Sequence, residues 1–316
     1  MYKILITGGA GFIGSHMVEY FFKKFKLANI VVVDKLTYSG KKFFLKEVLK
    51  SKRVKFIKSD IVNYKSYESE LKNVDCAINV AAESHVDNSF KSSIIFTKTN
   101  VLGSHIFFQN CLNHNIKKIV HISTDEVYGE IINGKSSEGD KFDPSNPYSG
   151  TKAAAEMIIS SYQRYIDPKK ILIIRSNNIY GTRQFPEKLI PVTITKLLKN
   201  KKIPVHGTGH YERCYLSVFD FSEAVYRLIK NKKSGIYNVG TASSYKNLEV
   251  ISEICRILNK NPEEFIKFVK DRPFNDKRYS LDLSKIAATG WEAKKNLFKD
   301  LPKIIDWYKK NLNIFK

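Results

Sequence analysis

The amino-acid sequence predicts an α/β protein built on a doubly wound parallel sheet, with a smaller mixed α/β portion that binds the substrate. Short β-branched runs alternate with longer helical patterns through the first half of the chain. A glycine-rich turn directly follows the first of these runs, and the alternation becomes irregular after residue 175. A chain of 316 residues is long enough for one large domain or two closely joined ones.

The first half provides the strands of the sheet and the helices that return the chain between them. Strands are expected at residues 3–7, 30–34, 55–59, 74–80, 118–123 and 170–175. Helices are expected at residues 12–25, 64–72, 93–114 and 148–165. Each helical pattern is long enough to let the next strand run parallel to the previous one.

The second half is predicted to be less regular. Turn-forming clusters are expected at residues 177–181, 206–209 and 271–276, helices at 187–198, 221–230 and 247–258, a strand at 235–240 and a closing helix at 297–310. No repeat or flexible linker separates the halves, so we expect a shared interface with a ligand cleft. The predicted division is a first domain over residues 1–176, completed by segments near 215–240, and a second portion over 177–316.

The composition excludes several classes of protein. There are 53 lysine and arginine residues against 31 acidic ones, but the lysines are spread through every segment, which is typical of a solvated surface. The four cysteines form no CxxC pair and the seven histidines no ligand spacing, so we expect a reducing compartment and no metal. No leader pattern and no run of ~18 apolar residues occurs. We therefore expect a cytoplasmic protein that binds neither nucleic acid nor membrane.

The turn after the first strand has the pattern of a dinucleotide site. Residues 8–14 are GGAGFIG, whose glycines allow a tight turn, close approach to a pyrophosphate, and packing of the next helix. Asp34 lies 20 residues beyond Gly14, where a carboxylate can bind ribose hydroxyls and repel a 2′-phosphate. The pattern therefore predicts a Rossmann-like fold with NAD, although Lys35 leaves an opening for NADP. The alternative is a tight turn without a ligand.

Tyr148 and Lys152 form a second pattern, four residues apart at the start of a helix marked by Pro144 and Pro147. At this spacing both side chains share one helix face. A phenol is a poor base near neutral pH because its pKa is about 10, and a neighbouring ammonium can lower that pKa. On its own the YxxxK pattern is common, and its two side chains most often only pack against their surroundings or face solvent.

Several motifs together resemble one family. They are ILITGGAGFIG at residues 4–14, DKLTY at 34–38, AAESHVD at 81–87, HISTDEVYG at 121–129, FPEKLIP at 185–191, DRPFNDKRY at 271–279, and the Tyr148/Lys152 pair. On these motifs the sequence is similar to the extended short-chain dehydrogenase/reductases, and within them to the nucleoside-diphosphate-glucose 4,6-dehydratases. The resemblance implies a lyase that holds NAD tightly and converts a nucleotide-linked glucose to its 4-keto-6-deoxy form.

Thr124-Asp125-Glu126 is the distinguishing segment, since related sugar-nucleotide 4-epimerases and decarboxylases share the fold and the Tyr148/Lys152 pair but not the two acids. The resemblance implies that Tyr148 takes the proton of the sugar 4-hydroxyl and that Thr124 hydrogen-bonds this oxygen. Glu126 then removes the C5 proton and Asp125 protonates the departing 6-hydroxyl, two roles that need carboxyls of different pKa. The alternatives are an epimerase or decarboxylase, a solvated acidic turn, and a binding module without turnover.

The resemblance also implies two sets of binding residues. Cofactor contacts are expected from Gly8, Gly11, Phe12, Ile13, Gly14, Asp34, Lys35, Thr37, Asp60, Ile61, Ala81, Ala82, Thr99, Tyr148 and Lys152. Contacts to the nucleotide sugar are expected from Ser84, Thr124, Asn178, Lys188, Leu189, Pro204, Val205, His206, Arg213, Asn247, Arg272 and Tyr279. Among these, Lys188, Arg213 and Arg272 offer cations to a diphosphate.

Some positions depart from the pattern of the bacterial dTDP-glucose enzymes. Ile179 stands in place of an asparagine, Asn275 in place of a histidine, and residues 212–220 lack the usual tryptophan. The segments at residues 175–181 and 272–276 look closer to the UDP-glucose 4,6-dehydratase part of plant-type rhamnose synthases. We therefore expect UDP-glucose rather than dTDP-glucose, a role in rhamnose-type deoxysugar synthesis, and a homodimer formed through the helices at 93–114 and 148–165.

Overall fold

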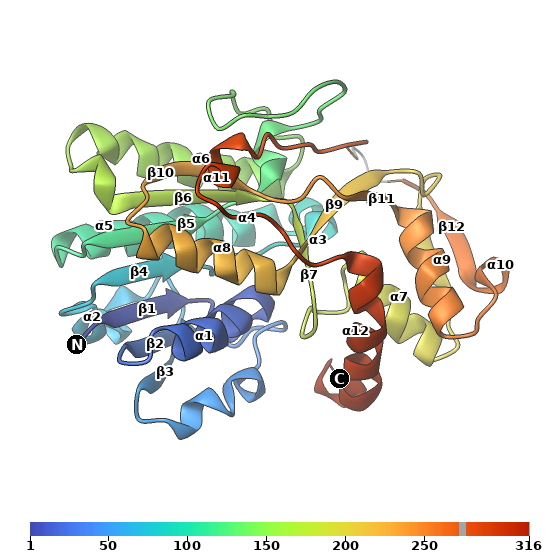
Figure 1. Ribbon diagram of the computed structural model, residues 1–316, viewed down its shortest axis with the longest axis horizontal. Helices are drawn as coiled ribbons and strands as arrows, with labels where there is room; N and C mark the ends of the chain where they lie inside the picture. Colours follow the sequence, from blue (N-terminus) through green and yellow to red (C-terminus); the bar gives the residue numbers. More distant parts are fainter. Residues whose placement is uncertain (272–275, 316) are drawn as a thin grey trace.

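A computed structural model shows a large parallel sheet between layers of helices, with a smaller portion beside it (Figure 1). It describes residues 1–271 and 276–315. Within them the large sheet has seven parallel strands in the order β10-β6-β5-β4-β1-β2-β3. They are β1 (Lys3–Thr7), β2 (Asn29–Asp34), β3 (Val54–Lys58), β4 (Cys76–Asn79), β5 (Lys118–Ile122), β6 (Ile171–Ser176) and β10 (Gly235–Val239). This is the predicted Rossmann-like, doubly wound fold.

The central strands are apolar at nearly every position because helices cover both faces of the sheet. The covering helices are α1 (Phe12–Lys24) and α8 (Val218–Lys230) on one face, and α5 (Ser104–Asn113) and α6 (Pro147–Ser161) on the other. Ile4 and Ile6 of β1 join the core under α1 and α8, whereas Leu5 joins the core under α5 and α6. Consecutive strand residues point to opposite faces, so both sets must be apolar.

The smaller portion has its own apolar core. One sheet contains β7 (Asn178–Tyr180), β9 (Glu212–Ser217) and β11 (Ser244–Lys246), and another contains β8 (Ile203–His206) and β12 (Ile266–Val269). The core forms between α7 (Leu189–Leu198), α9 (Asn247–Ile257) and α12 (Leu297–Asn311), whose buried residues include Ile194, Ile251 and Ile305. This core is separate from the two that cover the large sheet.

The predicted strands of the first half all occur close to their expected bounds. Two helical predictions need correction. The helix expected at 93–114 consists of α4 (Ser93–Phe96), a π-helical segment η4 (Thr97–Gly103) and α5, and the pattern at 64–72 forms a 3₁₀ turn followed by the short α2 (Glu68–Leu71). The strands of the smaller portion were missed because they are three to six residues long and pair with distant partners.

The chain crosses between the two portions more than once. After β7 to β9 in the smaller portion it returns to the large sheet, where α8 covers one face and β10 pairs with β6. A domain boundary at residue 176 stays a prediction. Within residues 1–271 and 276–315, no helix combines the length and apolar character needed to cross a membrane.

Candidate active site

A cleft of about 530 Å³ opens at the carboxyl ends of the large sheet, near the point where the strand order reverses between β1 and β4. Ligands of open α/β sheets bind at such a reversal. The lining includes nearly all the predicted site residues: Gly8, Gly11, Phe12, Ile13, Gly14, Asp34, Lys35, Thr37, Asp60, Ile61, Ala81, Ala82, Ser84, Thr99, Thr124, Glu126, Tyr148, Lys152, Asn178, Lys188, Leu189, Pro204, Val205, His206, Arg213, Asn247 and Tyr279. Asp125 is buried beside the wall, and Arg272 lies outside the described residues.

The turn between β1 and α1 depends on two glycines. Gly8 has φ +66°, and a Cβ at this position would lie 2.6 Å from the Ala81 nitrogen. A Cβ on Gly14 would lie 2.1 Å from the Gly8 carbonyl oxygen. The first turn of α1 carries no acidic side chain, and Gly11 at its N-cap has no side chain to occupy the N–H groups. The positive end of this helix therefore fits a pyrophosphate.

Asp34 ends β2 with its carboxylate bound to the same turn. Its Oδ2 accepts from the Ala10 nitrogen at 2.9 Å and its Oδ1 from the Leu36 nitrogen at 2.7 Å. Burial raises the pKa of Asp34, while these N–H donors lower it. The Lys35 ammonium lies 2.7 Å from the Asp60 carboxylate. Two carboxylates against one ammonium leave this corner acidic, which suits ribose hydroxyls better than a 2′-phosphate.

One buried amide holds the loop over residues 80–85, which joins β4 to the helix α3 (Val86–Lys91). Asn100 Oδ1 accepts from the Glu83 nitrogen at 2.9 Å, and its Nδ2 donates to the Glu83 oxygen at 3.0 Å and to Thr151 Oγ1 of α6 at 2.9 Å. Asn100 belongs to the π-helical segment η4, which also carries the predicted cofactor contact Thr99. π-Helical turns are frequent at functional sites.

Thr124, Asp125 and Glu126 follow β5 directly, where a 3₁₀ helix η5 (Asp125–Tyr128) begins. Asp125 is 2% exposed, and burial raises its pKa to about 7, a rise that a hydrogen bond from Asn177 opposes and the Glu126 charge increases. Enclosure in the cleft also raises the pKa of Glu126, while the Lys188 charge lowers it. The two adjacent carboxyls therefore have different surroundings, as an acid and a base acting at one pH require.

Tyr148 and Lys152 lie in the first turns of α6. Lys152 Nζ donates to the Ile122 oxygen at 2.5 Å, and burial lowers the pKa of Lys152 to about 8, partly opposed by Glu156. Burial raises the pKa of Tyr148 well above its usual value, and the Glu126 charge raises it further. The sequence predicted a lowered pKa for Tyr148. The structure differs because burial and the charges of Glu126 and Asp125 raise this pKa, opposed by a hydrogen bond with Thr124.

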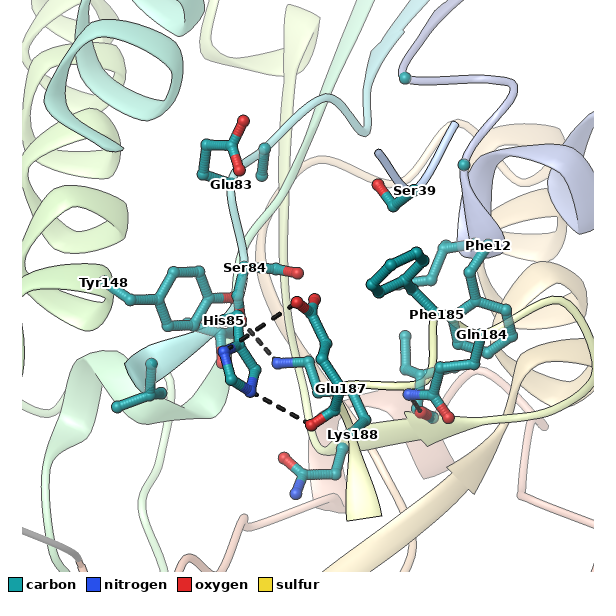
Figure 2. A pocket seen from close by; sticks show the side chains of 18 of the residues that line it. Phe12, Ser39, Glu83, Ser84, His85, Tyr148, Gln184, Phe185, Glu187 and Lys188 are labelled. Atoms are coloured by element: carbon teal, nitrogen blue, oxygen red, sulfur yellow. Dashed lines mark hydrogen bonds and ion pairs between the residues drawn. The ribbon is translucent and has the colours of Figure 1, made fainter. Parts of the chain in front are cut away.

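One end of the cleft joins the two portions of the molecule. Figure 2 shows Tyr148, Ser84, His85, Glu187 and Lys188 facing one another there. Lys188 Nζ donates to the Ser84 oxygen at 2.6 Å, and His85 Nε2 lies 3.2 Å from the Glu187 oxygen. These contacts tie the segment before α7 to the loop after β4 across the cleft.

The opposite wall is built around Arg213 of β9. Its Nη2 donates to the Asp276 oxygen at 2.7 Å, and its guanidinium lies 4.8 Å from the centre of the Tyr279 ring. The Tyr279 hydroxyl and Ser145 Oγ both donate to Asp276 Oδ2. The other predicted substrate contacts come from β7 (Asn178), the start of α7 (Leu189), β8 (Pro204, Val205, His206) and the start of α9 (Asn247).

Further residues line the cleft that were not predicted as site residues. They include Glu83, His85, Asp87, Asn146, Asn177, Gln184, Phe185, Glu187, Tyr215 and Asp276. For His85 and Glu187 the signal was present, since both lie inside motifs that contain predicted contacts. Tyr215 carried no such signal because it reaches the cleft only through the pairing of β9 with β7.

Comparison with known proteins agrees with this geometry. A family model described as GDP-mannose 4,6 dehydratase matches residues 5–303. The dTDP-D-glucose 4,6-dehydratase of Dictyostelium discoideum is 39% identical over 98% of this chain and 82% of its own length. A trifunctional UDP-glucose 4,6-dehydratase, 3,5-epimerase and reductase of Arabidopsis thaliana is 40% identical over 98% of this chain and 47% of its own length.

A solved structure extends the likeness to three dimensions. The dTDP-glucose 4,6-dehydratase of Streptomyces venezuelae, crystallised with NAD bound, superposes with a TM-score of 0.94 at 33% identity, covering 99% of this chain and 100% of that one. The sequence and the fold therefore both resemble those of 4,6-dehydratases over nearly the whole chain. The chain belongs to the family described as GDP-mannose 4,6 dehydratase, whose members here have the extended short-chain dehydrogenase/reductase fold.

Proposed function

We propose that this protein is a nucleotide-sugar 4,6-dehydratase that converts a nucleoside-diphosphate glucose to its 4-keto-6-deoxy form. The observation that carries the proposal is the pair of carboxyls after β5. Asp125 is buried with a pKa raised to about 7, and Glu126 faces the cleft near Tyr148. An elimination needs one group that gives a proton and one that takes a proton.

The residues divide the work as follows. To receive the proton of the sugar 4-hydroxyl, Tyr148 must be a phenolate. Burial raises its pKa, and the positive charges of Lys152 and of a bound nicotinamide would oppose that rise. Thr124 hydrogen-bonds the same sugar oxygen. The resulting 4-ketone makes the C5 hydrogen acidic, so Glu126 can remove it. Asp125 gives its proton to the departing 6-hydroxyl, which leaves as water. Lys152, held against the Ile122 carbonyl, keeps a positive charge close to the reacting oxygen.

NAD fits the glycine turn, Asp34 and the loop after β4. The helix end at Gly11 would face its pyrophosphate, and Asp34 and Asp60 form the acidic corner for its ribose. When bound, NAD would supply the hydride acceptor for C4 and the hydride donor for C6 after water has left. With a proton returned to C5, the 4-keto-6-deoxy sugar forms and the cofactor is restored within one turnover. The enzyme then needs no external reductant.

The nucleotide is proposed to be UDP, with rhamnose-type deoxysugar synthesis as the destination of the product. Support comes from Ile179 and Asn275, which depart from the dTDP-glucose pattern, and from the Arabidopsis relative that acts on UDP-glucose. The Dictyostelium relative, almost equally similar, acts on dTDP-glucose. One methyl group on the base is worth only about 1–3 kcal/mol of discrimination, so activity with both nucleotides is expected.

The test is to incubate the purified protein and NAD with UDP-glucose and, separately, with dTDP-glucose. Product is followed by the loss of one water in the mass spectrum. Water loss from either substrate supports the dehydratase, and the ratio of kcat/KM identifies the nucleotide. Mass-neutral products, or loss of carbon dioxide from a uronic-acid substrate, would assign the protein to the epimerases or decarboxylases instead.

A homodimer is also proposed. Exposed apolar side chains gather on α4, η4 and α6: Ile94 is 77%, Ile95 54%, Leu102 48% and Met157 60% exposed. A surface of this kind marks a protein interface. Light scattering should give twice the chain mass, and Ile95→Glu should shift the protein toward monomer. A monomeric wild-type protein would contradict the proposal.

A cytoplasmic location is proposed as well. Cys76, Cys111, Cys214 and Cys255 are all buried and free. Unpaired thiols suit a reducing compartment.

A further inference from the structure

Two side chains donate to the acid Asp125: the amide of Asn177 at 2.9 Å and the hydroxyl of Thr124 at 3.3 Å. Asn177 follows β6 and is 3% exposed. Its Nδ2 donates to Asp125 Oδ2 at 2.9 Å, and its Oδ1 accepts from the Thr241 nitrogen at 3.0 Å. Both ends of the amide are therefore engaged.

The Thr241 bond decides which way the Asn177 amide points. A backbone N–H can only donate, so the atom facing Thr241 must be the carbonyl oxygen of the amide. The NH₂ group then has to face Asp125. Gly240 makes this approach possible, because a Cβ there would lie 2.0 Å from Asn177 Oδ1.

A fixed donor at Oδ2 restricts where Asp125 can carry its proton. The NH₂ group cannot accept a hydrogen bond, so a proton on Oδ2 would point at another donor. Oδ1 instead lies 3.3 Å from Thr124 Oγ1. This hydroxyl donates when Asp125 is ionised, but it can also turn to accept a proton, which the amide NH₂ group cannot do. Thr124 is the residue proposed to hydrogen-bond the sugar 4-oxygen, so Oδ1 is the oxygen on the side of the proposed reaction.

We propose that Asn177 is a positioning residue that keeps the acid proton of Asp125 on Oδ1, the oxygen facing Thr124 and the cleft. This inference rests on the proposed function, in which Asp125 is the acid. In the elimination Glu126 takes the C5 proton, and the electrons of that C–H bond form the C5–C6 double bond as the C6–O bond breaks. The proton of Oδ1 passes to the leaving oxygen, and Asp125 is left as a carboxylate that Asn177 still stabilises.

Asn177→Asp is the discriminating variant. An aspartate has the same shape and can still accept from Thr241, but it offers no fixed donor and competes with Asp125 for one proton. We expect dehydration to slow by about tenfold or more, since general acid catalysis contributes about 10²–10⁴-fold. The alkaline limb of its pH profile should move to higher pH and KM should change little. Oxidation at C4, followed by the absorbance of bound reduced nicotinamide in single turnovers, should be kept.

A double variant and a matched control complete the test. In the Asp125→Asn background, Asn177→Asp should slow dehydration no further, because the two residues act as a unit. Asn296→Asp is matched, since Asn296 also accepts from a backbone N–H, of Lys299, and donates to a side chain, Tyr245, away from the cleft. It should leave the activity unchanged.

Three results would overturn the inference. They are an unshifted pH limb, an equal slowing of C4 oxidation and dehydration, and full additivity with Asp125→Asn. If the wild-type protein loses no water from either substrate, the proposed function fails first, and that outcome is seen before any variant is made.

Discussion

The carboxyl ends of β1 and β5 lie in one sheet, separated only by β4, yet they carry different chemistry. β1 leads into a glycine turn and the bare N-terminus of α1. β5 leads into Thr124, Asp125 and Glu126, whose two carboxyls have raised pKa values. Backbone N–H groups hold an anion in the same way at every pH, whereas the buried carboxyl of Asp125, with its pKa raised to about 7, exchanges its proton near neutrality. In this cleft, holding the cofactor and moving protons are therefore assigned to different strand ends, and mutations should separate them.

The largest effect on activity is expected from Tyr148→Phe, a change among the groups that are proposed to move protons. Loss of the phenol removes the group that accepts the 4-hydroxyl proton, so product formation should fall by about 10²–10⁴-fold. The NAD content of the purified protein should fall far less than the activity, because Tyr148 is only one of many expected cofactor contacts. Mass spectrometry of the product and assay of the released cofactor check both parts. Tyr162→Phe, which removes a hydroxyl bonded to His105 at 2.9 Å, is the matched control. Loss of NAD together with activity would show that the two strand ends are not separable.

The complementary change, at the strand end that is proposed to hold the cofactor, is Gly14→Ala. A Cβ there would lie 2.1 Å from the Gly8 carbonyl oxygen, so the turn must shift. We expect most of the bound NAD to be lost and the free energy of unfolding to fall by roughly 1–3 kcal/mol. Added NAD should restore part of the activity. Gly139→Ala, where a Cβ meets nothing within 4 Å, serves as control. Normal NAD content in Gly14→Ala would contradict the assignment.

The pH dependence follows from Asp125, whose pKa is raised to about 7. The acid must carry a proton, so the dehydration rate should fall about tenfold per unit as pH rises beyond that value. Because the folded pKa lies above the unfolded value of about 3.9, the stability contributed by neutral Asp125 is complete below about pH 4 and is lost as pH rises to about 7. Asp125→Asn should therefore be more stable than wild type at pH 8, by roughly 1–3 kcal/mol. Its advantage over wild type should be smaller at pH 5. Urea unfolding of both proteins at both pH values measures this difference in stability. An equal difference at pH 5 and pH 8 would contradict the prediction.

The smallest effect is expected from Lys35→Ala. The Lys35–Asp60 ion pair is largely solvated, with the lysine side chain 57% exposed, so its loss should change NAD affinity by less than about 1 kcal/mol. Titration of NAD at low and high salt measures the effect, which should shrink further at high salt. A tenfold loss of NAD affinity would mean that the corner formed by Asp34, Lys35 and Asp60, rather than the glycine turn, dominates cofactor binding.

The cleft residues at the ends of the large-sheet strands could be predicted from local patterns, whereas those of the smaller portion came only from the family resemblance. Gly8 to Gly14 follow β1, Asp34 ends β2, and Thr124 to Glu126 follow β5 after Ser123; the ends of parallel strands meet at one sheet edge. Asn177 follows β6 and carried the same strand-end signal, whereas Tyr215 reaches the cleft through the pairing of β9 with β7, which no local pattern predicts. The π-helical segment at Thr97–Gly103 also gave no periodic signal distinct from an ordinary helix.

The sequence by itself determined the parallel sheet, the glycine turn and the set of groups proposed to react, because strand period, glycine spacing and residue chemistry are local properties. Only the tertiary structure decided the protonation of these groups and their orientation. Burial raised the pKa of Tyr148 where an adjacent ammonium predicted a fall, and the backbone of Thr241 fixed the amide that faces Asp125. Desolvation and hydrogen-bond direction depend on neighbours far away in the chain, and these exist only in the folded molecule.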